Sequence, residues 1–247
     1  MSRTSQTPIR NNSIPVTIII PCYNHAKWLH RAVDSVIQQE YENKKITIID
    51  DGSSDGSFEE AEKIIQTYQD KCPISVTKLT ENRGPSFARN VGIKQEWEST
   101  LIFGMLDADD TYLPGKIDKS VDKIMENPTV VGIVYGDAIL DNHLNGSKIH
   151  EYREPYSRKR LEQNCTMSTQ NFITKYAFSV CGLYDEDMRT VEDWDLQLRI
   201  TSKFIGIHIP EPLSTYSVTG ENASNVVDKA VWEENWAKIR ERYGEKY

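Results

Sequence analysis

The fold is decided by VTIIIPCYN at residues 16–24, together with ITIIDDGSS at residues 46–54. Each segment begins with a β-branched run, which is typical of a strand buried on both faces of a sheet, and Pro21 is expected to end the first strand. Apolar residues at helical spacing follow each segment, over residues 28–37 and 58–68. The order strand, helix, strand, helix predicts parallel strands joined by right-handed crossovers.

The same alternation continues outward along the chain. Strands and helices are predicted in turn at residues 76–79, 87–93, 101–106, 117–125 and 130–135. The fold class is therefore predicted to be α/β, with a Rossmann-like, mostly parallel sheet flanked by helices. Residues 136–167 are polar and lack a clear period, so they are expected to form a functional loop or a mobile lid.

One domain is expected at residues 14–225, preceded by a flexible N-terminus at residues 1–13 and followed by an amphipathic helix at residues 226–247. The last helix carries an aromatic stripe that includes Trp236 and Tyr243. Such a stripe must pack on something. Three alternatives stay open: its own domain, a second copy in a homodimer, or peripheral contact with a membrane surface.

Charge and composition exclude several classes of protein. The 247 residues carry a formal net charge of −8 and the 29 basic residues are scattered, so no nucleic acid partner is expected. No stretch approaches the roughly 18 apolar residues of a membrane span, and the N-terminus lacks the apolar core of a signal peptide. A cytoplasmic protein without a transmembrane segment is expected. The four cysteines lie far apart and are interpreted as reduced thiols, Cys22 among them.

Acidic residues follow two of the predicted strands directly. Asp50-Asp51 comes after one strand and Asp107-Ala108-Asp109 after another, and ligands of open parallel sheets bind at the carboxyl ends of the strands. The spacing puts Asp107 and Asp109 on one side of an extended segment, where they can face a metal ion and the ribose of a nucleotide. The alternative is an Asp-rich turn in which Asp110 and Thr111 cap the following helix.

A second acidic cluster, Glu192-Asp193-Trp194-Asp195, lies at the start of a predicted helix. A helix N-terminus stabilises negative charge, so capping explains part of the cluster. A carboxylate that keeps a free lone pair can also act as a general base that accepts the proton of a hydroxyl group. Asp193 is the candidate for this base.

These motifs follow one another in a recognisable order: Pro21-Cys22-Tyr23-Asn24, Asp50-Asp51-Gly52-Ser53, Asn82-Arg83-Gly84, Ala88-Arg89-Asn90, Leu106-Asp107-Ala108-Asp109-Asp110 and Glu192-Asp193-Trp194-Asp195-Leu196. Together they resemble the family-2 glycosyltransferases, inverting enzymes with the GT-A fold, from about Val16 to about Ser224. The resemblance implies a GT-A domain that moves a sugar from a nucleotide-diphosphate sugar, with a UDP-sugar expected, to a carbohydrate or lipid-linked acceptor.

The resemblance also implies roles for individual residues. It assigns donor nucleotide binding to Pro21, Tyr23, Asn24, Asp51, Arg83, Arg89, Asp107 and Ala108. Asp51 would bind the uracil ring, and either Arg83 or Arg89 would face the ligand. Asp107 and Asp109 would hold Mn²⁺ or Mg²⁺, and Asp193 would be the catalytic base.

Two departures from the family pattern qualify these expectations. Many relatives have a histidine near the end of the domain where this chain reads Tyr216-Ser217-Val218-Thr219, which implies a weaker metal site completed by water. The Gln-x-x-Arg-Trp element of processive relatives is absent, which favours a single addition. The alternatives are a non-catalytic sugar- or nucleotide-binding module, or a sugar nucleotidyltransferase, although the glycine-rich basic loop of the latter is missing after the first strand.

Three further sites have alternative interpretations. His208 is interpreted as a packed or surface residue, with a metal ligand as the alternative. Asp137 could line the sugar pocket or belong to a turn. Asn222-Ala223-Ser224 matches the N-glycosylation pattern and is interpreted as a chance match, since no secretory signal precedes it.

Overall fold

The computed structural model describes residues 12–222 and 227–244. Most of the N-terminal segment that is predicted to be flexible lies outside the described residues. The strands form one sheet in the order β3-β2-β1-β4-β8-β6-β9-β5, and β7 pairs with β6. The strands are β1 (Val16–Cys22), β2 (Lys44–Asp50), β3 (Ile74–Lys78), β4 (Ile102–Met105), β5 (Thr111–Tyr112), β6 (Val131–Asn142), β7 (Lys148–Glu151), β8 (Phe172–Thr174) and β9 (Ile205–Val218).

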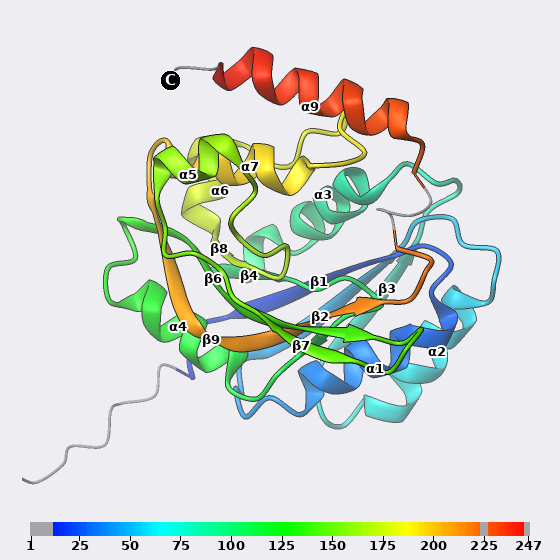
Figure 1. Cartoon of the computed structure of the whole chain (residues 1–247). Helices are drawn as coiled ribbons and strands as arrows, with labels where there is room; N and C mark the ends of the chain where they lie inside the picture. Colours follow the sequence, from blue (N-terminus) through cyan, green and yellow to red (C-terminus); the bar gives the residue numbers. More distant parts are fainter. Residues whose placement is uncertain (1–11, 223–226, 245–247) are drawn as a thin grey trace, which may run out of the picture.

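Helices cover both faces of this sheet. They are α1 (Ala26–Ile37), α2 (Ser57–Tyr68), α3 (Pro85–Gln95), the 3-10 helix η1 (Trp97–Ser99), α4 (Lys116–Met125), α5 (Arg158–Gln163), α6 (Lys175–Cys181), α7 (Glu192–Thr201) and α9 (Lys229–Tyr243). Figure 1 shows α1, α2 and α4 on one face and α3, α6 and α7 on the other. Ile18 and Ile20 of β1 belong to one apolar core and Ile19 to the other, because side chains alternate along a strand. The predicted α/β class is confirmed.

The first half of the sheet is parallel, as predicted, from β3 through β2 and β1 to β4. The prediction that Pro21 ends β1 is wrong, because the strand continues to Cys22. The carbonyl of Ile19 accepts a hydrogen bond from Leu106 N, and its pairing partner on β4 is Met105, where β4 ends. Pro21 is two residues beyond Ile19, so its backbone faces the same neighbouring strand, β4. That strand has already ended at this point, so the missing N–H of Pro21 removes no hydrogen bond from the sheet.

The second half of the sheet contains the main departure from the sequence prediction. Strand β6 runs on to Asn142 and forms a hairpin with β7, and helix α5 follows. Residues 136–167 are therefore not a structureless loop. The register of β6 against β9 shifts on both sides of Asp137, and such bulges break the alternation that identifies a strand in a sequence. Strand β8 is antiparallel to both neighbours and has three residues, too few to show a period.

The C-terminal helix α9 packs on its own domain, which is the first of the three alternatives for its aromatic stripe. In Figure 1 it lies across α5 and α7. Ile239 is buried, and the rings of Trp236 and Trp194 meet edge to face with centroids 5.3 Å apart. The hydroxyl of Tyr243 donates to Asp195 Oδ1 at 2.9 Å. Among the described residues, no helix has the length and apolar character needed to span a bilayer.

Candidate functional site

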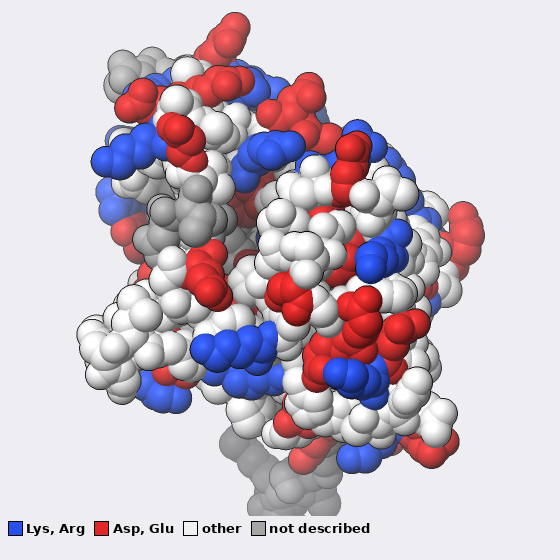
Figure 2. Space-filling view, turned by 90° about the vertical axis from the view of Figure 1, so that its right-hand side faces the viewer, with Lys and Arg blue, Asp and Glu red and all other residues white. Residues whose placement is uncertain are grey.

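The loops after β1, β2 and β4 meet on one side of the molecule, because parallel strands end at a common edge. Figure 2 shows this side. The surface is hollowed between an upper and a lower part, with Asp and Glu atoms inside the hollow and Lys and Arg atoms around it. Ligands of this sheet architecture bind in such a hollow at the carboxyl ends of the strands.

The loops after β1 and β2 are tied together by side chains. Asn24 has a positive φ of 55°, its backbone N–H donates to Ser53 Oγ at 2.9 Å, and its Oδ1 accepts from Ser54 N at 2.9 Å. Asp55 Oδ2 accepts from Ala26 N, at the start of α1, at 3.0 Å. These bonds fix the backbone on which the predicted nucleotide residues lie. Tyr23 is 44% exposed beside them.

Asp51 joins the second loop to a third. Its two carboxylate oxygens accept from Arg83 N at 2.9 Å and Gly84 N at 2.8 Å, and burial raises its pKa. Gly52 is required beside it, because φ is +74° and a Cβ would lie 2.7 Å from the backbone carbon of Glu81. Asp51 thus orders the segment that carries Arg83, and a carboxylate has further lone pairs for a ligand donor.

Arg89 connects the two acidic clusters. It is 4% exposed, and it donates to Asp107 Oδ1 at 2.6 Å and to Glu192 Oε1 at 2.6 Å. Its guanidinium also lies 5.3 Å from the ring centroid of Tyr184. Arg83 is different, since its guanidinium stacks on Phe87 at 3.6 Å and the residue is exposed. The structure therefore places Arg89 inside the site, between its halves, and Arg83 at the surface.

The acidic residues after β4, Asp109 and Asp110, differ in their hydrogen-bond partners and in their roles. Asp109 is 8% exposed, and burial together with the charge of Asp107 raises its pKa to about 6. Asp110 is fully buried and accepts from Ser217 N at 2.7 Å and from the amide of Gln170. It ties this loop to β9 and caps no helix. The capping alternative is therefore wrong: Thr111 begins a strand, and the next helix follows Gly115.

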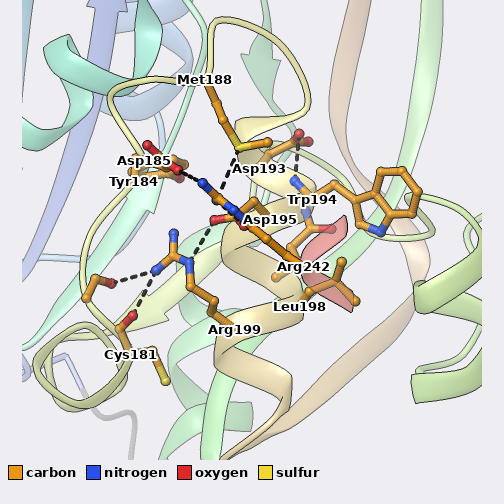
Figure 3. Close-up of polar contacts among 12 residues, drawn as sticks. Cys181, Tyr184, Asp185, Met188, Asp193, Trp194, Asp195, Leu198, Arg199 and Arg242 are labelled. Atoms are coloured by element: carbon orange, nitrogen blue, oxygen red, sulfur yellow. Dashed lines mark hydrogen bonds and ion pairs between the residues drawn. The ribbon is translucent and has the colours of Figure 1, made fainter. Parts of the chain in front are cut away.

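The second acidic cluster forms the first turn of α7, and its three carboxylates differ in their partners. Glu192 pairs with Arg89. Asp195 is fully buried and pairs with Arg199 at 2.7 Å and Arg242 at 3.0 Å (Figure 3). Asp193 forms no ion pair within the described part of the chain and is partly exposed.

Asp193 also has the electrostatics of a proton acceptor. Its Oδ1 accepts from Trp194 N at 2.8 Å, and the Cys165 thiol lies 3.8 Å from Oδ2. Burial and the neighbouring charge of Glu192 raise its pKa to about 7. A carboxylate with a pKa near the working pH is suited to general base catalysis.

The sequence reasoning missed three residues that lie next to Asp109: Arg31 donates to its backbone oxygen at 2.9 Å, and His25 and Asn222 lie at its carboxylate. His25 Nδ1 donates to Tyr23 O at 2.8 Å, while its Nε2 lies 3.7 Å from Asp109 Oδ2. Asn222 Nδ2 donates to the same carboxylate oxygen at 3.0 Å and to Ser217 O at 2.6 Å. No local pattern distinguishes these residues, because only the fold brings residues 25, 31, 109 and 222 together. Asn222 is 7% exposed, which agrees with its interpretation as a chance glycosylation match.

The structure also decides between the interpretations of His208 and Asp137. His208 Nε2 is 2.7 Å from Asp137 Oδ1 and His150 Nε2 is 2.9 Å from Oδ2. Burial acts to raise the pKa of Asp137, but hydrogen bonds from Arg153 N and the two imidazoles outweigh it and lower the pKa. The turn interpretation of Asp137 is wrong, because the residue lies inside β6, where it anchors the β6–β7 hairpin. His208 is a packed residue. Cys22 is buried, and burial raises its pKa to about 12, as expected of an inert thiol.

Comparisons with known proteins point to one family. Residues 17–186 match the family described as Glycosyl transferase family 2. An uncharacterized glycosyltransferase of Rickettsia prowazekii is 31% identical over 194 residues, which cover 73% of this chain and 57% of the relative. A second, from Rickettsia typhi, is 30% identical over 204 residues, with 76% and 60% covered. The chain thus spans less than two thirds of the length of these relatives.

Solved structures share the fold. TarS of Staphylococcus aureus, residues 1–349 in complex with UDP-GlcNAc, superposes with a TM-score of 0.70 at 18% identity, over 93% of this chain and 65% of that chain. The mannosyltransferase PcManGT of Pyrobaculum calidifontis, in complex with GDP-Man and Mn²⁺, gives a TM-score of 0.66 at 18% identity, over 86% and 60%.

Proposed function

Since the chain belongs to glycosyl transferase family 2, we propose that it moves a sugar from a nucleotide-diphosphate sugar, with a UDP-sugar as the expected donor, to a hydroxyl group of an acceptor. Its fold is that of the GT-A glycosyltransferases. The acceptor is a carbohydrate or a lipid-linked sugar in this proposal, and one sugar is added per reaction.

One observation supports the proposal above all others. Arg89 holds Asp107, from the loop after β4, and Glu192, from the first turn of α7, on the same guanidinium. This contact brings the two acidic clusters together, although they are far apart in the sequence. Asp193 follows Glu192 directly and is the carboxylate of this turn that has no ion pair among the described residues. This arrangement supports a donor site and a catalytic base that lie side by side.

The reaction would follow from this arrangement as one in-line displacement. The acceptor oxygen forms a bond to the anomeric carbon while the bond from that carbon to the diphosphate breaks, so the anomeric configuration inverts. Asp193 accepts the proton that the hydroxyl group loses. The loops ordered by Asn24 and Asp51 would bind the nucleotide base, and Asp107 would bind the ribose.

The carboxylates after β4 fit a divalent cation. Asp109 is buried, and burial together with the negative charge of Asp107 raises its pKa, so a cation bound there would stabilise the ionised carboxylates. Within the described residues, no group of three His, Cys, Asp or Glu side chains could hold a metal by itself, which fits an ion shared with donor phosphates. When bound, Mn²⁺ or Mg²⁺ would neutralise the charge of the leaving diphosphate.

Thermal unfolding with nucleotides tests the donor site. We expect UDP with Mn²⁺ at about a hundredfold excess over its Kd to raise the Tm by about 5 °C, because a ligand of the native state stabilises it. Asp109→Ala should remove most of the part that depends on Mn²⁺. Asp70→Ala, at an exposed position after α2, is the control and should behave as the wild type. If neither UDP nor GDP shifts the Tm, with or without metal, the donor site is assigned wrongly.

A further inference from the structure

A buried nitrogen with no hydrogen-bond partner faces the carboxylate of Asp109. It is Nε2 of His25, which is enclosed by the protein and has no partner among the described residues. The Nε2 atom lies 3.7 Å from Asp109 Oδ2, beyond the range of a good hydrogen bond. A polar atom in this position is costly unless something else binds it.

The tautomer of His25 follows from its other nitrogen. Nδ1 lies 2.8 Å from the backbone oxygen of Tyr23, and because a carbonyl can only accept, Nδ1 carries the hydrogen. In the neutral ring, Nε2 then carries a lone pair that points toward the carboxylate of Asp109. Two acceptors that face each other in a buried place repel each other, and a cation bound between them would stabilise both. Metal-binding histidines commonly have this arrangement, with the other nitrogen donating to a backbone carbonyl.

We propose that His25 Nε2 and Asp109 Oδ2 are ligands of the same divalent metal ion, a role that rests on the proposed donor site. Ligand bonds of about 2.1 Å from each atom are compatible with the 3.7 Å between them. Asn222 is a positioning residue of this site, because its Nδ2 donates to the same carboxylate oxygen at 3.0 Å.

An imidazole ligand also sets the metal preference. Mg²⁺ prefers oxygen ligands and an octahedral shell, whereas imidazole suits transition metals. The pair of His25 and Asp109 therefore selects Mn²⁺ over Mg²⁺. The loss of the imidazole should weaken the binding of Mn²⁺ more than the binding of Mg²⁺. If the role of His25 were only structural, both ions would be weakened equally.

Electron paramagnetic resonance of Mn²⁺ tests the proposal with the full chain and saturating UDP, and with GDP in a parallel series. The wild-type protein should show a ¹⁴N coupling to Mn²⁺ that changes to a ¹⁵N coupling when histidine is labelled with ¹⁵N. His25→Ala and His25→Gln should lose the coupling and bind Mn²⁺ about tenfold or more weakly, since even indirect contacts of a metal site are worth that much. His30→Ala, at an exposed position of α1, is the control and should keep both the ¹⁴N coupling and the wild-type affinity for Mn²⁺.

The outcomes separate this inference from the proposed function. If the wild type binds Mn²⁺ with nucleotide but shows no histidine coupling, the role of His25 is refuted while the donor site stands. If His25→Ala weakens the binding of Mn²⁺ and of Mg²⁺ equally, the proposed selectivity is refuted. If the wild type binds no Mn²⁺ with either nucleotide, the metal-dependent donor site fails together with the inference.

Discussion

Arg89 is the residue on which the geometry of the site depends most. It is almost fully buried and carries one positive charge between Asp107 and Glu192. We predict that Arg89→Met lowers the free energy of unfolding by about 3 kcal/mol, because it leaves two carboxylates without their partner. Arg83→Met should change it by less than about 0.5 kcal/mol, since Arg83 is exposed. Urea unfolding of both variants measures the difference, and equal losses would contradict the role of Arg89.

The raised pKa of Asp193 predicts how the reaction rate depends on pH. A base acts in its ionised form, and the pKa of Asp193 is raised to about 7. The value of kcat/KM should therefore fall about tenfold per pH unit below pH 7 and level off above it. Asp193→Asn should lower the rate about 10²- to 10⁴-fold while nucleotide binding is kept. Asp187→Asn, at an exposed position before α7, is the control. A full rate in Asp193→Asn would refute the assignment of the base.

The residues show what a sequence can and cannot predict about a site. Asp51 and Asp107 were predicted to lie near each other because each follows a strand, and the ends of parallel strands meet at one edge. The pairing of Arg89 with Glu192 had no such signal, since the two are far apart in the chain and Arg89 lies inside a helix. The same holds for His25 and Asn222, which reach Asp109 only in the folded chain.

Among the elements, α9 has the contact that is easiest to test. Its Arg242 pairs with Asp185 at 2.6 Å and with the buried Asp195 of α7 at 3.0 Å (Figure 3). We predict that Arg242→Met costs about 1 kcal/mol of stability, because the arginine is partly exposed and Asp195 keeps Arg199. Amide hydrogen exchange of α9 should rise while that of β1 stays unchanged. Arg240→Met, at an exposed position of the same helix, should leave both unchanged, and an unaltered α9 in Arg242→Met would contradict this anchoring.

The elements also differ in how well their sequence predicts them. The strands and helices from β1 to α2 have simple periods, and the structure confirms them. Strand β6 was predicted to end near residue 135, because the bulges around Asp137 hide its continuation. The three residues of β8 pair with β4 and β6 through contacts that no local pattern encodes. Local periods predict an element when its pairing is regular, and fail when register shifts or distant partners define it.

At the scale of the whole molecule, the site lies where two parts of the chain meet. The parallel strands β1, β2 and β4 present the loops proposed to bind the donor, and α7 on the upper layer presents Asp193 (Figure 1). The ion pairs of Arg89 hold these parts together. The chain spans 57% and 60% of its rickettsial relatives, so acceptor recognition by the whole protein is a proposal beyond this site.

The measurement that tests the central claim most directly is ¹H NMR of the sugar released from nucleotide sugars when water replaces the acceptor. A panel of UDP- and GDP-sugars is incubated with the protein and Mn²⁺, and the first anomer is recorded before mutarotation. We predict that a donor with an α linkage releases the β anomer, and that Asp193→Asn releases almost none. Release of the α anomer would contradict inversion, and a full rate of release by Asp193→Asn would contradict its role as the base.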